Sequence, residues 1–348
     1  MRQASFISGS AKASFMVFAL LFSAANFANA KPAQISGEII FKVTVDAPRE
    51  SDNVRVWIPY PVSGKYQKIE DVKIDGNFDS QNVLADGDTG NLALYAEWKK
   101  PSSEQRYVTF SFKASSFERK SGNFPAVEPV IPKYINPFLK ETKFIPTDGE
   151  IRKIALEATK GKRTIAEKHK AIYDWMVENT KRDPSVKGCG TGIVDQALAK
   201  RGGKCADLSS VYVALARSAG VPAREVFGLR LGKKEGESDM TKGHHCWAEY
   251  YQPGYGWVQT DPADVLKFML VNNISLEQAD SVRKYYFNTV DSRRIVLGRG
   301  GRDIYLNPRQ NGGPLNYFMY PYAEVDGKPL EWLAAQKKLK YKVTFKRN

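Results

Sequence analysis

The hydrophobic and polar positions of the chain follow a strand-like pattern up to about residue 120. Short runs rich in β-branched and aromatic residues alternate with turn clusters of Asp, Gly and Asn, which is typical of antiparallel strands. The runs cover residues 38–45, 54–58, 92–98 and 107–112. They predict an all-β, sandwich-like domain over residues 31–122. This region holds no histidine and no cysteine, so we expect it to serve docking or packing rather than chemistry.

A proline-rich stretch, residues 123–147, separates this domain from a region with helical periodicity. Its prolines and aromatic side chains indicate an ordered, extended connection. From residue 148 onward, apolar positions recur every three to four residues, and Thr164 with Glu167 forms a capping box. We expect helices at residues 151–159, 164–180, 193–200, 205–219 and 275–287.

Strand-like runs follow the helix that begins at Cys205. One run covers residues 224–231, and a hairpin with arms 244–251 and 257–261 turns through residues 253–256. Helices followed by antiparallel strands predict an α+β core over residues 148–290. Later strand-like pieces predict a C-terminal β extension, residues 291–348, that packs on this core. The pieces cover residues 294–297, 303–306, 316–320 and 341–345.

The first 30 residues have the composition of a targeting segment. Arg2 and Lys12 precede an apolar run at residues 15–22, and residues 28–30 (Ala-Asn-Ala) form a small-x-small cleavage site. This predicts a signal peptide that is cleaved after Ala30, and hence a periplasmic or secreted protein. The apolar run is about half of the ~20 residues that a membrane span needs, and no later segment is long enough to cross a bilayer.

The charge is strongly positive, at +14 for the whole chain and 14 − 2 = +12 without Arg2 and Lys12. Such a surface suits polyanions, for example anionic lipid headgroups or acidic cell-wall polymers. The basic residues are scattered and are not interleaved with aromatic residues as in nucleic-acid-binding modules. We therefore expect no nucleic-acid partner.

Three cysteines are available for chemistry, namely Cys189, Cys205 and Cys246. In an oxidising compartment, an odd number leaves one thiol over, so a Cys189–Cys246 disulfide with Cys205 free is one arrangement. Three isolated thiols are the other. Cys205 begins a helix, where unpaired backbone N–H groups and the helix dipole favour a thiolate.

The hairpin offers a base and a group to orient it, which a thiol nucleophile needs. A turn centred at residue 253 or 254 sets Asp261 directly across from His245 or one diagonal step away, within carboxylate–imidazole reach. Taken alone, His245 is more often a core residue and Asp261, before Pro262, a turn initiator. Together with Cys205, they predict a Cys–His–Asp triad.

Four motifs in this order resemble the transglutaminase-like domain family, a branch of the papain-like cysteine enzymes. They are residues 203–207 (Gly-Lys-Cys-Ala-Asp), 216–224, 245–247 (His-Cys-Trp) and 256–262 (Gly-Trp-Val-Gln-Thr-Asp-Pro). The resemblance covers about residues 151–266. It implies a papain-like core, with Cys205 as nucleophile, His245 as general base and acid, and Asp261 as the orienting residue. Asp207 also matches the family pattern, and we expect it to start or pack the helix. Residues 188–190 and 263–264 resemble the exported bacterial members.

The expected function is that of an exported, cysteine-dependent acyl-transfer enzyme acting on amide bonds of a peptide or protein, with cell-wall peptide among the candidate substrates. The resemblance slightly favours hydrolysis over amine cross-linking. No cofactor is expected, and the acidic loop at residues 234–239 lacks the ligand spacing of an EF-hand. The alternatives are a non-catalytic module that binds peptide or cell wall, and an assembly partner that works through its β domain. The sequence gives no expectation for the oligomeric state or for the second oxyanion donor.

Overall fold

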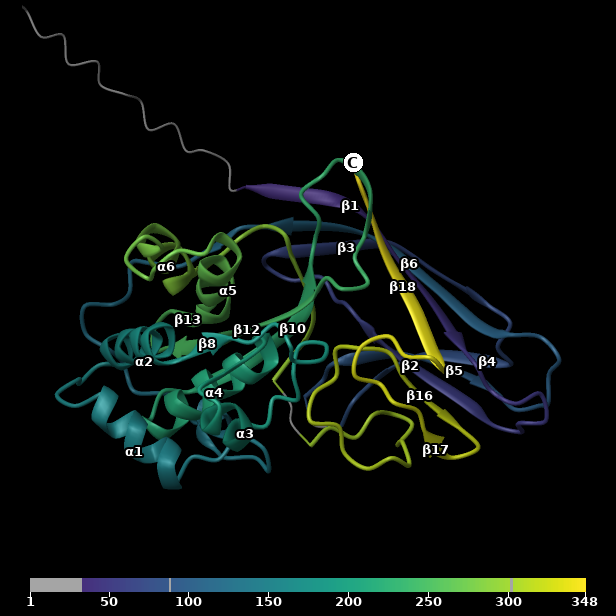
Figure 1. Ribbon diagram of the computed structural model, residues 1–348, viewed down its shortest axis with the longest axis horizontal. Helices are drawn as coiled ribbons and strands as arrows, with labels where there is room; N and C mark the ends of the chain where they lie inside the picture. Colours follow the sequence, from purple (N-terminus) through teal and green to yellow (C-terminus); the bar gives the residue numbers. More distant parts are fainter. Residues whose placement is uncertain (1–32, 88, 301–302) are drawn as a thin grey trace, which may run out of the picture. The chain divides into compact units, whose positions relative to one another are not determined.

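The computed structural model describes residues 33–87, 89–300 and 303–348 (Figure 1). The signal peptide that we expect at residues 1–30 lies outside the described residues and stays a prediction. Within the described part of the chain, no helix is both long enough and apolar enough to span a membrane.

A sandwich is formed by two five-stranded antiparallel sheets. Its strands are β1 (Gln34–Val45), β2 (Val54–Tyr60), β3 (Gln67–Gly76), β4 (Ser80–Ala85), β5 (Leu92–Trp98), β6 (Arg106–Phe117), β11 (Gly236–Asp239), β16 (Tyr322–Val325), β17 (Lys328–Pro329) and β18 (Leu339–Arg347). One sheet has the order β11-β18-β1-β6-β3, and the other has the order β17-β16-β2-β5-β4. Alternate residues of β1, such as Ile39 and Phe41, are fully buried and belong to one cluster with Val56 of β2.

A four-stranded sheet with surrounding helices forms the second part. Its order is β13-β12-β10-β15, and α4 lies against β12 and β10. Its elements are η1 (Lys133–Leu139), α1 (Gly149–Ala158), α2 (Ile165–Asn179), α3 (Val194–Ala199), α4 (Cys205–Ser218), β10 (Ala223–Arg230), β12 (His244–Gln252), β13 (Gly256–Thr260), α5 (Pro262–Asn272), α6 (Asp280–Phe287) and β15 (Arg294–Arg299). Short pairs join β7 (Arg119–Lys120) to β14 (Thr289–Val290) and β8 (Lys181–Arg182) to β9 (Gly202–Gly203). The α+β class expected from the sequence is confirmed.

Helix α4 is the centre of this second part. Every residue from Cys205 to Arg217 is buried, because α1, α2, α3 and α5 cover the sides that the sheet leaves open. All nine residues of β12 are buried, because strands lie at both edges, α4 and α2 contact it, and side chains of β7 and β14 pack on Trp247. The helix stops at Gly220, whose positive φ of 79° suits a glycine after a helix.

The C-terminal segment packs against the core, with Tyr317 on Phe227 and Met319 on Cys246, but it also completes the sandwich, which the sequence did not predict. Only β15 joins the core sheet, whereas β16 pairs with β2 and β18 pairs with β1 along nine residues. Figure 1 shows the yellow β18 beside the purple β1. The reason is that β1 and β2 each have an edge that only these late strands cover. The sandwich is therefore not built from residues 31–122 alone.

Further elements differ from the sequence prediction, and the strand predicted at residues 316–320 does not form. The sequence pattern predicts one helix after Pro262, at residues 275–287, whereas the structure has α5 before it as well. Part of the loop predicted after residue 232 forms β11 on the edge of β18. The strand-like piece at residues 303–306 makes only an isolated bridge, between Ile304 and Leu315.

Candidate active site

Cys205 occupies the first residue of α4, directly after Lys204, the N-cap residue. Its side chain is buried, with 1% of the residue exposed. Burial by itself raises the pKa of the Cys205 thiol, but hydrogen bonds with Cys189, Cys246 and His245 and the charge of His245 outweigh it. The pKa therefore lies well below that of an ordinary thiol, which favours a thiolate.

His245 and Asp261 meet where β12 runs past the start of α5. The Nε2 atom of His245 lies 2.8 Å from Oδ2 of Asp261. The other oxygen of Asp261 accepts the backbone N–H of Asp264 at 3.0 Å, so the carboxylate caps α5 and cannot rotate freely. The strands pair only as far as Ala248 and Thr260, which makes the relation between His245 and Asp261 diagonal. With Nε2 engaged, Nδ1 is the ring nitrogen left for Cys205.

A buried guanidinium, that of Arg294, stands behind the Asp261 carboxylate. Its Nη1 lies 3.1 Å from Asp261 Oδ2, and Nη2 pairs with Asp264 and Asp291. Burial alone lowers the pKa of Arg294, but these three carboxylates raise it well above its usual value. Arg294 therefore keeps its charge and forms a buried ion pair with Asp261 on the oxygen that also contacts His245.

Asp264 and Arg294 are site residues that the sequence reasoning did not identify. Asp264 lies 3.7 Å from His245 Nε2 and forms ion pairs with Arg230 and Arg294. The signal for Asp264 was present, since it lies three residues after Asp261 in the first turn of a helix that opens with proline. Arg294 had no such signal, because it comes from β15, more than 30 residues later in the chain.

The three cysteine sulfurs form one buried cluster, with all ligand atoms within 4.8 Å of one another. All three are free thiols, so the expected disulfide between Cys189 and Cys246 is absent from the structure. Cys189 contacts the carbonyl oxygen of His244 at 3.2 Å, and Cys246 faces the sulfur of Met319 at 3.7 Å. Cys189 and Cys246 therefore each contact another atom and do not form a disulfide with each other.

Asp207 holds the loop that brings Cys189 next to Cys205. Its carboxylate accepts the backbone N–H groups of Gly192 at 2.9 Å and of Lys204 at 3.0 Å. Gly190 comes so close that an added Cβ would lie 1.9 Å from Oδ2 of Asp207. Asp207 thus lies at the helix start and in packing contact, as the sequence led us to expect.

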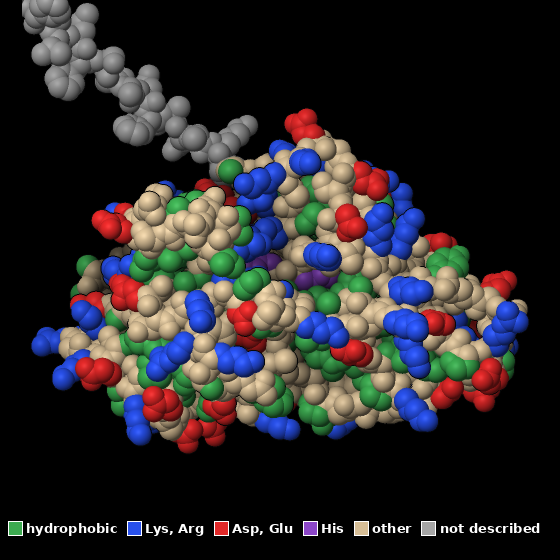
Figure 2. All heavy atoms as spheres, in the orientation of Figure 1, with side chains coloured by type: hydrophobic (Ala, Val, Ile, Leu, Met, Phe, Trp, Pro, Cys, Tyr) green, Lys and Arg blue, Asp and Glu red, His purple; other side chains and the backbone are tan. Residues whose placement is uncertain are grey.

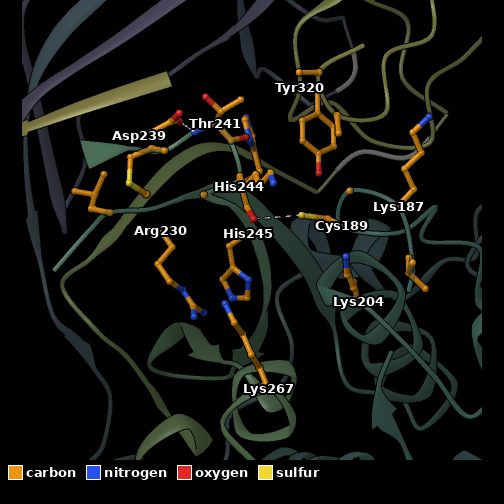
Figure 3. A pocket seen from close by; sticks show the side chains of 18 of the residues that line it. Lys187, Cys189, Lys204, Arg230, Asp239, Thr241, His244, His245, Lys267 and Tyr320 are labelled. Carbon is orange, nitrogen blue, oxygen red and sulfur yellow. Dashed lines mark hydrogen bonds between the residues drawn. The ribbon is translucent and has the colours of Figure 1, made fainter. Parts of the chain in front are cut away.

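A cavity of about 750 Å³ opens beside this group (Figure 3). His245 and Cys189 line it, while Cys205 lies behind them and is not part of the lining. Figure 2 shows histidine side chains at the bottom of a hollow that is flanked by Lys and Arg side chains. The arrangement therefore combines a thiol of lowered pKa, an oriented imidazole and a cavity for a substrate, which is what nucleophilic attack on an acyl group needs.

Comparisons with known proteins show which family the chain resembles. A family model for the transglutaminase-like superfamily matches residues 152–262. An uncharacterized protein from Haemophilus influenzae is 34% identical over 306 residues, covering 79% of this chain and 81% of that protein. A protein-glutamine gamma-glutamyltransferase from Pseudomonas aeruginosa is 35% identical over 75 residues, which are 20% of this chain and 11% of that enzyme.

The fold also resembles a solved structure from Cytophaga hutchinsonii that is provisionally described as a cysteine protease. The two superpose with a TM-score of 0.55 over 91% of this chain and 99% of that chain, at 14% identity. The likeness therefore extends over the sandwich as well as over the helical part that holds Cys205.

Proposed function

The chain belongs to the transglutaminase-like superfamily, and from this membership and the geometry around Cys205 we propose that it is a cysteine-dependent enzyme acting on amide bonds. Cys205 is the nucleophile, His245 the general base and acid, and Asp261 the residue that orients His245. The observation that carries the proposal is the 2.8 Å contact between His245 Nε2 and Asp261 Oδ2, which leaves Nδ1 for the thiol.

The first half of the reaction forms a thioester. Nδ1 of His245 takes the proton of the Cys205 thiol, and the thiolate attacks the carbonyl carbon of the substrate amide. The backbone N–H of Cys205 lies in the first turn of α4, where helix N–H groups lack intrahelical acceptors, and donates to the oxyanion. The C–N bond then breaks, and the imidazolium of His245 returns the proton to the leaving amine or ammonia.

The second half releases the acyl group. His245 removes a proton from water or from a primary amine as its oxygen or nitrogen attacks the thioester carbonyl. The C–S bond then breaks and Cys205 leaves as the thiolate, which gives a carboxylic acid from water or a new amide from the amine. Throughout, Asp261 fixes the tautomer of His245. The burial of Cys205 supports hydrolysis over amine transfer, because water reaches a covered thioester more easily than a long amine side chain does.

The expected substrate is a peptide or protein outside the cytoplasm, with cell-wall peptide among the candidates. This location rests on the signal-peptide pattern at residues 1–30. The cavity of about 750 Å³ is large enough for several atoms on each side of a scissile amide.

A second candidate is a non-catalytic binding module that has kept the fold. One observation favours it: Cys205 is only 1% exposed and does not line the cavity. In that case, a Cys205→Ser variant would bind peptide and support biological activity as well as the parent protein does.

The experiment incubates the purified protein with glutamine-containing peptides, cell-wall peptides and a primary-amine probe, with Cys205→Ala as the control. Release of ammonia or of a peptide fragment that depends on Cys205 would support hydrolysis, and incorporation of the probe would support amine transfer. If neither product forms while peptides still bind, the enzyme proposal is wrong and the binding module is favoured.

A further inference from the structure

Positive charge dominates the lining of the cavity beside His245. Six cationic side chains and one carboxylate, that of Asp239, line it. The cations are Arg182, Lys187, Lys204, Arg230, Lys242 and Lys267. Figure 3 shows Arg230 and Lys267 near His245, with Lys204 on the side of Cys189. The ratio of cationic to acidic side chains in the lining is therefore much higher than in the chain as a whole.

Some of these cations are already paired within the protein. Arg230 pairs with Asp264, and Lys187 pairs with Glu331 at the surface. Among the described residues, no ion pair involves Arg182, Lys204 or Lys267. The Nη1 atom of Arg182 is also buried without a hydrogen-bond partner in the described part of the chain. Three half-buried cations therefore face the cavity without a carboxylate of their own.

These cations come from separate elements that the fold holds in place. Arg182 lies in β8, Lys204 caps α4, and Lys267 projects from α5. Burial, and then the charges of Arg230 and Arg182, lowers the pKa of Lys267. Packing of like charges near one another costs free energy, and an anion in the cavity would offset that cost.

The thiolate of Cys205 does not account for all of this charge. Arg182, Lys204 and Lys267 carry +3, and a thiolate paired with the charge of His245 adds no net charge, so these three positive charges remain. A role that is limited to lowering the pKa of Cys205 would leave this surplus unexplained. The surplus faces the space that a substrate must enter to reach His245.

We propose that the cavity binds an acidic peptide, and that Lys267 and Arg182 hold a Glu or Asp side chain of the substrate near the amide that Cys205 attacks. This inference rests on the proposed function, because the adjacent thiol chemistry is what makes a peptide, rather than an acidic polysaccharide, the fitting anion. A carboxylate accepts hydrogen bonds from both an ammonium and a guanidinium, and a half-buried cavity screens these contacts less than bulk water does.

The first test uses two alkylating reagents that differ mainly in charge. Iodoacetate carries a carboxylate and iodoacetamide does not, and both modify the thiolate. The ratio of their rates at Cys205, followed by peptide mass, is divided by the same ratio for free cysteine. We expect a normalised ratio of about ten in low salt, because two nearby cations attract the anion, with a marked fall in high salt. A normalised ratio near one would overturn the inference.

Variants show which charges are responsible. Lys267→Gln and Arg182→Gln should each reduce the normalised ratio severalfold, and together they should bring it close to one. Lys160→Gln, at an exposed lysine after α1, is the matched control and should leave the ratio unchanged. If Lys160→Gln lowers the ratio as much as the cavity variants do, the effect comes from net charge and the inference fails.

The second test measures binding without turnover. Cys205→Ala is titrated with two labelled decapeptides that differ only in Glu against Gln, and with an acidic oligosaccharide of equal charge. We expect the Glu peptide to bind about tenfold more tightly than the Gln peptide, and Lys267→Gln to remove the difference. Equal binding of both peptides, or tighter binding of the oligosaccharide, would overturn the inference.

The tests also separate this inference from the proposed function. If Cys205 reacts quickly with both reagents but shows no preference for iodoacetate, the inference fails and the proposed function stands. If neither reagent modifies Cys205 faster than free cysteine, the proposed function fails as well.

Discussion

Asp261 and His245 are joined by a hydrogen bond of 2.8 Å while the second carboxylate oxygen of Asp261 caps helix α5. One side chain thus fixes both the imidazole and the start of a helix. Because the carboxylate is anchored at both oxygens, its position does not depend on a flexible rotamer. The orientation of the imidazole is therefore built into the end of the hairpin.

Replacing Asp261 by Asn separates these two roles. Asparagine still accepts the N–H of Asp264, so we expect α5 to form, but the buried ion pair with Arg294 is lost and the free energy of unfolding should fall by about 3 kcal/mol. The neutral amide is a weaker acceptor for the imidazolium N–H, and its NH2 group can donate to the imidazole and fix the wrong tautomer, so kcat should fall by about a hundredfold to ten-thousandfold. Peptide hydrolysis and urea denaturation measure the two effects. Asp148→Asn, at an exposed N-cap that makes no side-chain cap bond, is the control and should change neither.

The lowered pKa of Cys205 has a direct consequence for the pH dependence of alkylation. Burial opposes the thiolate, but hydrogen bonds and the charge of His245 favour it, so the thiolate persists to lower pH than it does in free cysteine. Between pH 8.5 and 6.5, we expect the iodoacetamide rate at Cys205 to change by about threefold or less, whereas that of free cysteine falls by about fiftyfold or more. Stopped aliquots analysed by peptide mass give both rates.

His245→Gln provides the control for this profile. Without the imidazole, the pKa of Cys205 should rise, and the rate should fall with decreasing pH as it does for free cysteine. A pH profile that His245→Gln leaves unchanged would contradict the assignment of His245 as the partner of the thiol.

Gly190 has room for no side chain. Its φ is 95°, and an added Cβ would lie 1.9 Å from Oδ2 of Asp207. We expect Gly190→Ala to lower the free energy of unfolding by about 3 kcal/mol and to disturb the loop that carries Cys189. Gly64→Ala is the matched control, because nothing lies within 4 Å of its added Cβ and its φ is not positive. Equal thermal shifts for the two variants would contradict the close packing at Asp207.

The sequence was sufficient to predict the site residues whose positions follow from nearby residues in the chain. Cys205 could be placed because Gly202 and Gly203 precede a helical pattern, and His245 could be paired with Asp261 because a hairpin relates residues by counting from its turn. Arg294 could not be found in this way, since its contact with Asp261 depends on how β15 aligns beside β10.

The sequence also could not show which β strands pair with each other, because pairing depends on contacts between distant segments. The alternating pattern at residues 341–345 predicts a strand but does not specify its partner, and pairing of β18 with β1 joins segments about 300 residues apart. Register and partner depend on which edges remain uncovered after the rest of the chain has folded. Cys189 and Cys246 show the limit for side chains, because an odd number of cysteines constrains the number of disulfides but not the contacts of each thiol.

The free thiols lead to a prediction for the intact mass. The protein, denatured without reductant and treated with iodoacetamide, should take up three carbamidomethyl groups, because Cys189, Cys205 and Cys246 are all free. Reduction before alkylation should give the same mass. Uptake of one group without reductant and three after reduction would contradict the structure and support the Cys189–Cys246 disulfide expected from the sequence.

His169 of α2 leads to a prediction about acid stability. It is fully buried, and its Nδ1 lies 2.8 Å from the hydroxyl oxygen of Tyr212, while its ring stacks on that of Tyr250 with centroids 3.8 Å apart. Burial lowers the pKa of His169 from 6.5 to about 3, and burial lowers the pKa of His244 to about 4. Both histidines are therefore neutral in the folded protein at pH 5.

The sign of the effect follows from the lowered pKa values. Above pH 6.5 both histidines are neutral in the folded and unfolded chain, so they add no pH dependence. As the pH falls below 6.5, the unfolded chain binds protons that the folded protein does not, and the free energy of unfolding decreases by up to about 1.4 kcal/mol per pH unit for each histidine. Urea denaturation at several pH values between 7.5 and 5 measures this slope.

Two variants at the contact between His169 and Tyr212 separate the effect of histidine protonation on stability from the effect of packing. His169→Gln removes the titrating group, so its slope between pH 6.5 and 5 should be smaller by about 1.4 kcal/mol per pH unit, although the variant is less stable at pH 7. Tyr212→Phe removes the hydroxyl that contacts His169 but keeps the histidine, so it should lose stability at pH 7 and retain the full slope. Identical slopes in the parent and in His169→Gln would show that His169 is protonated in the folded protein. The prediction that His169 is buried in its neutral form would then be wrong.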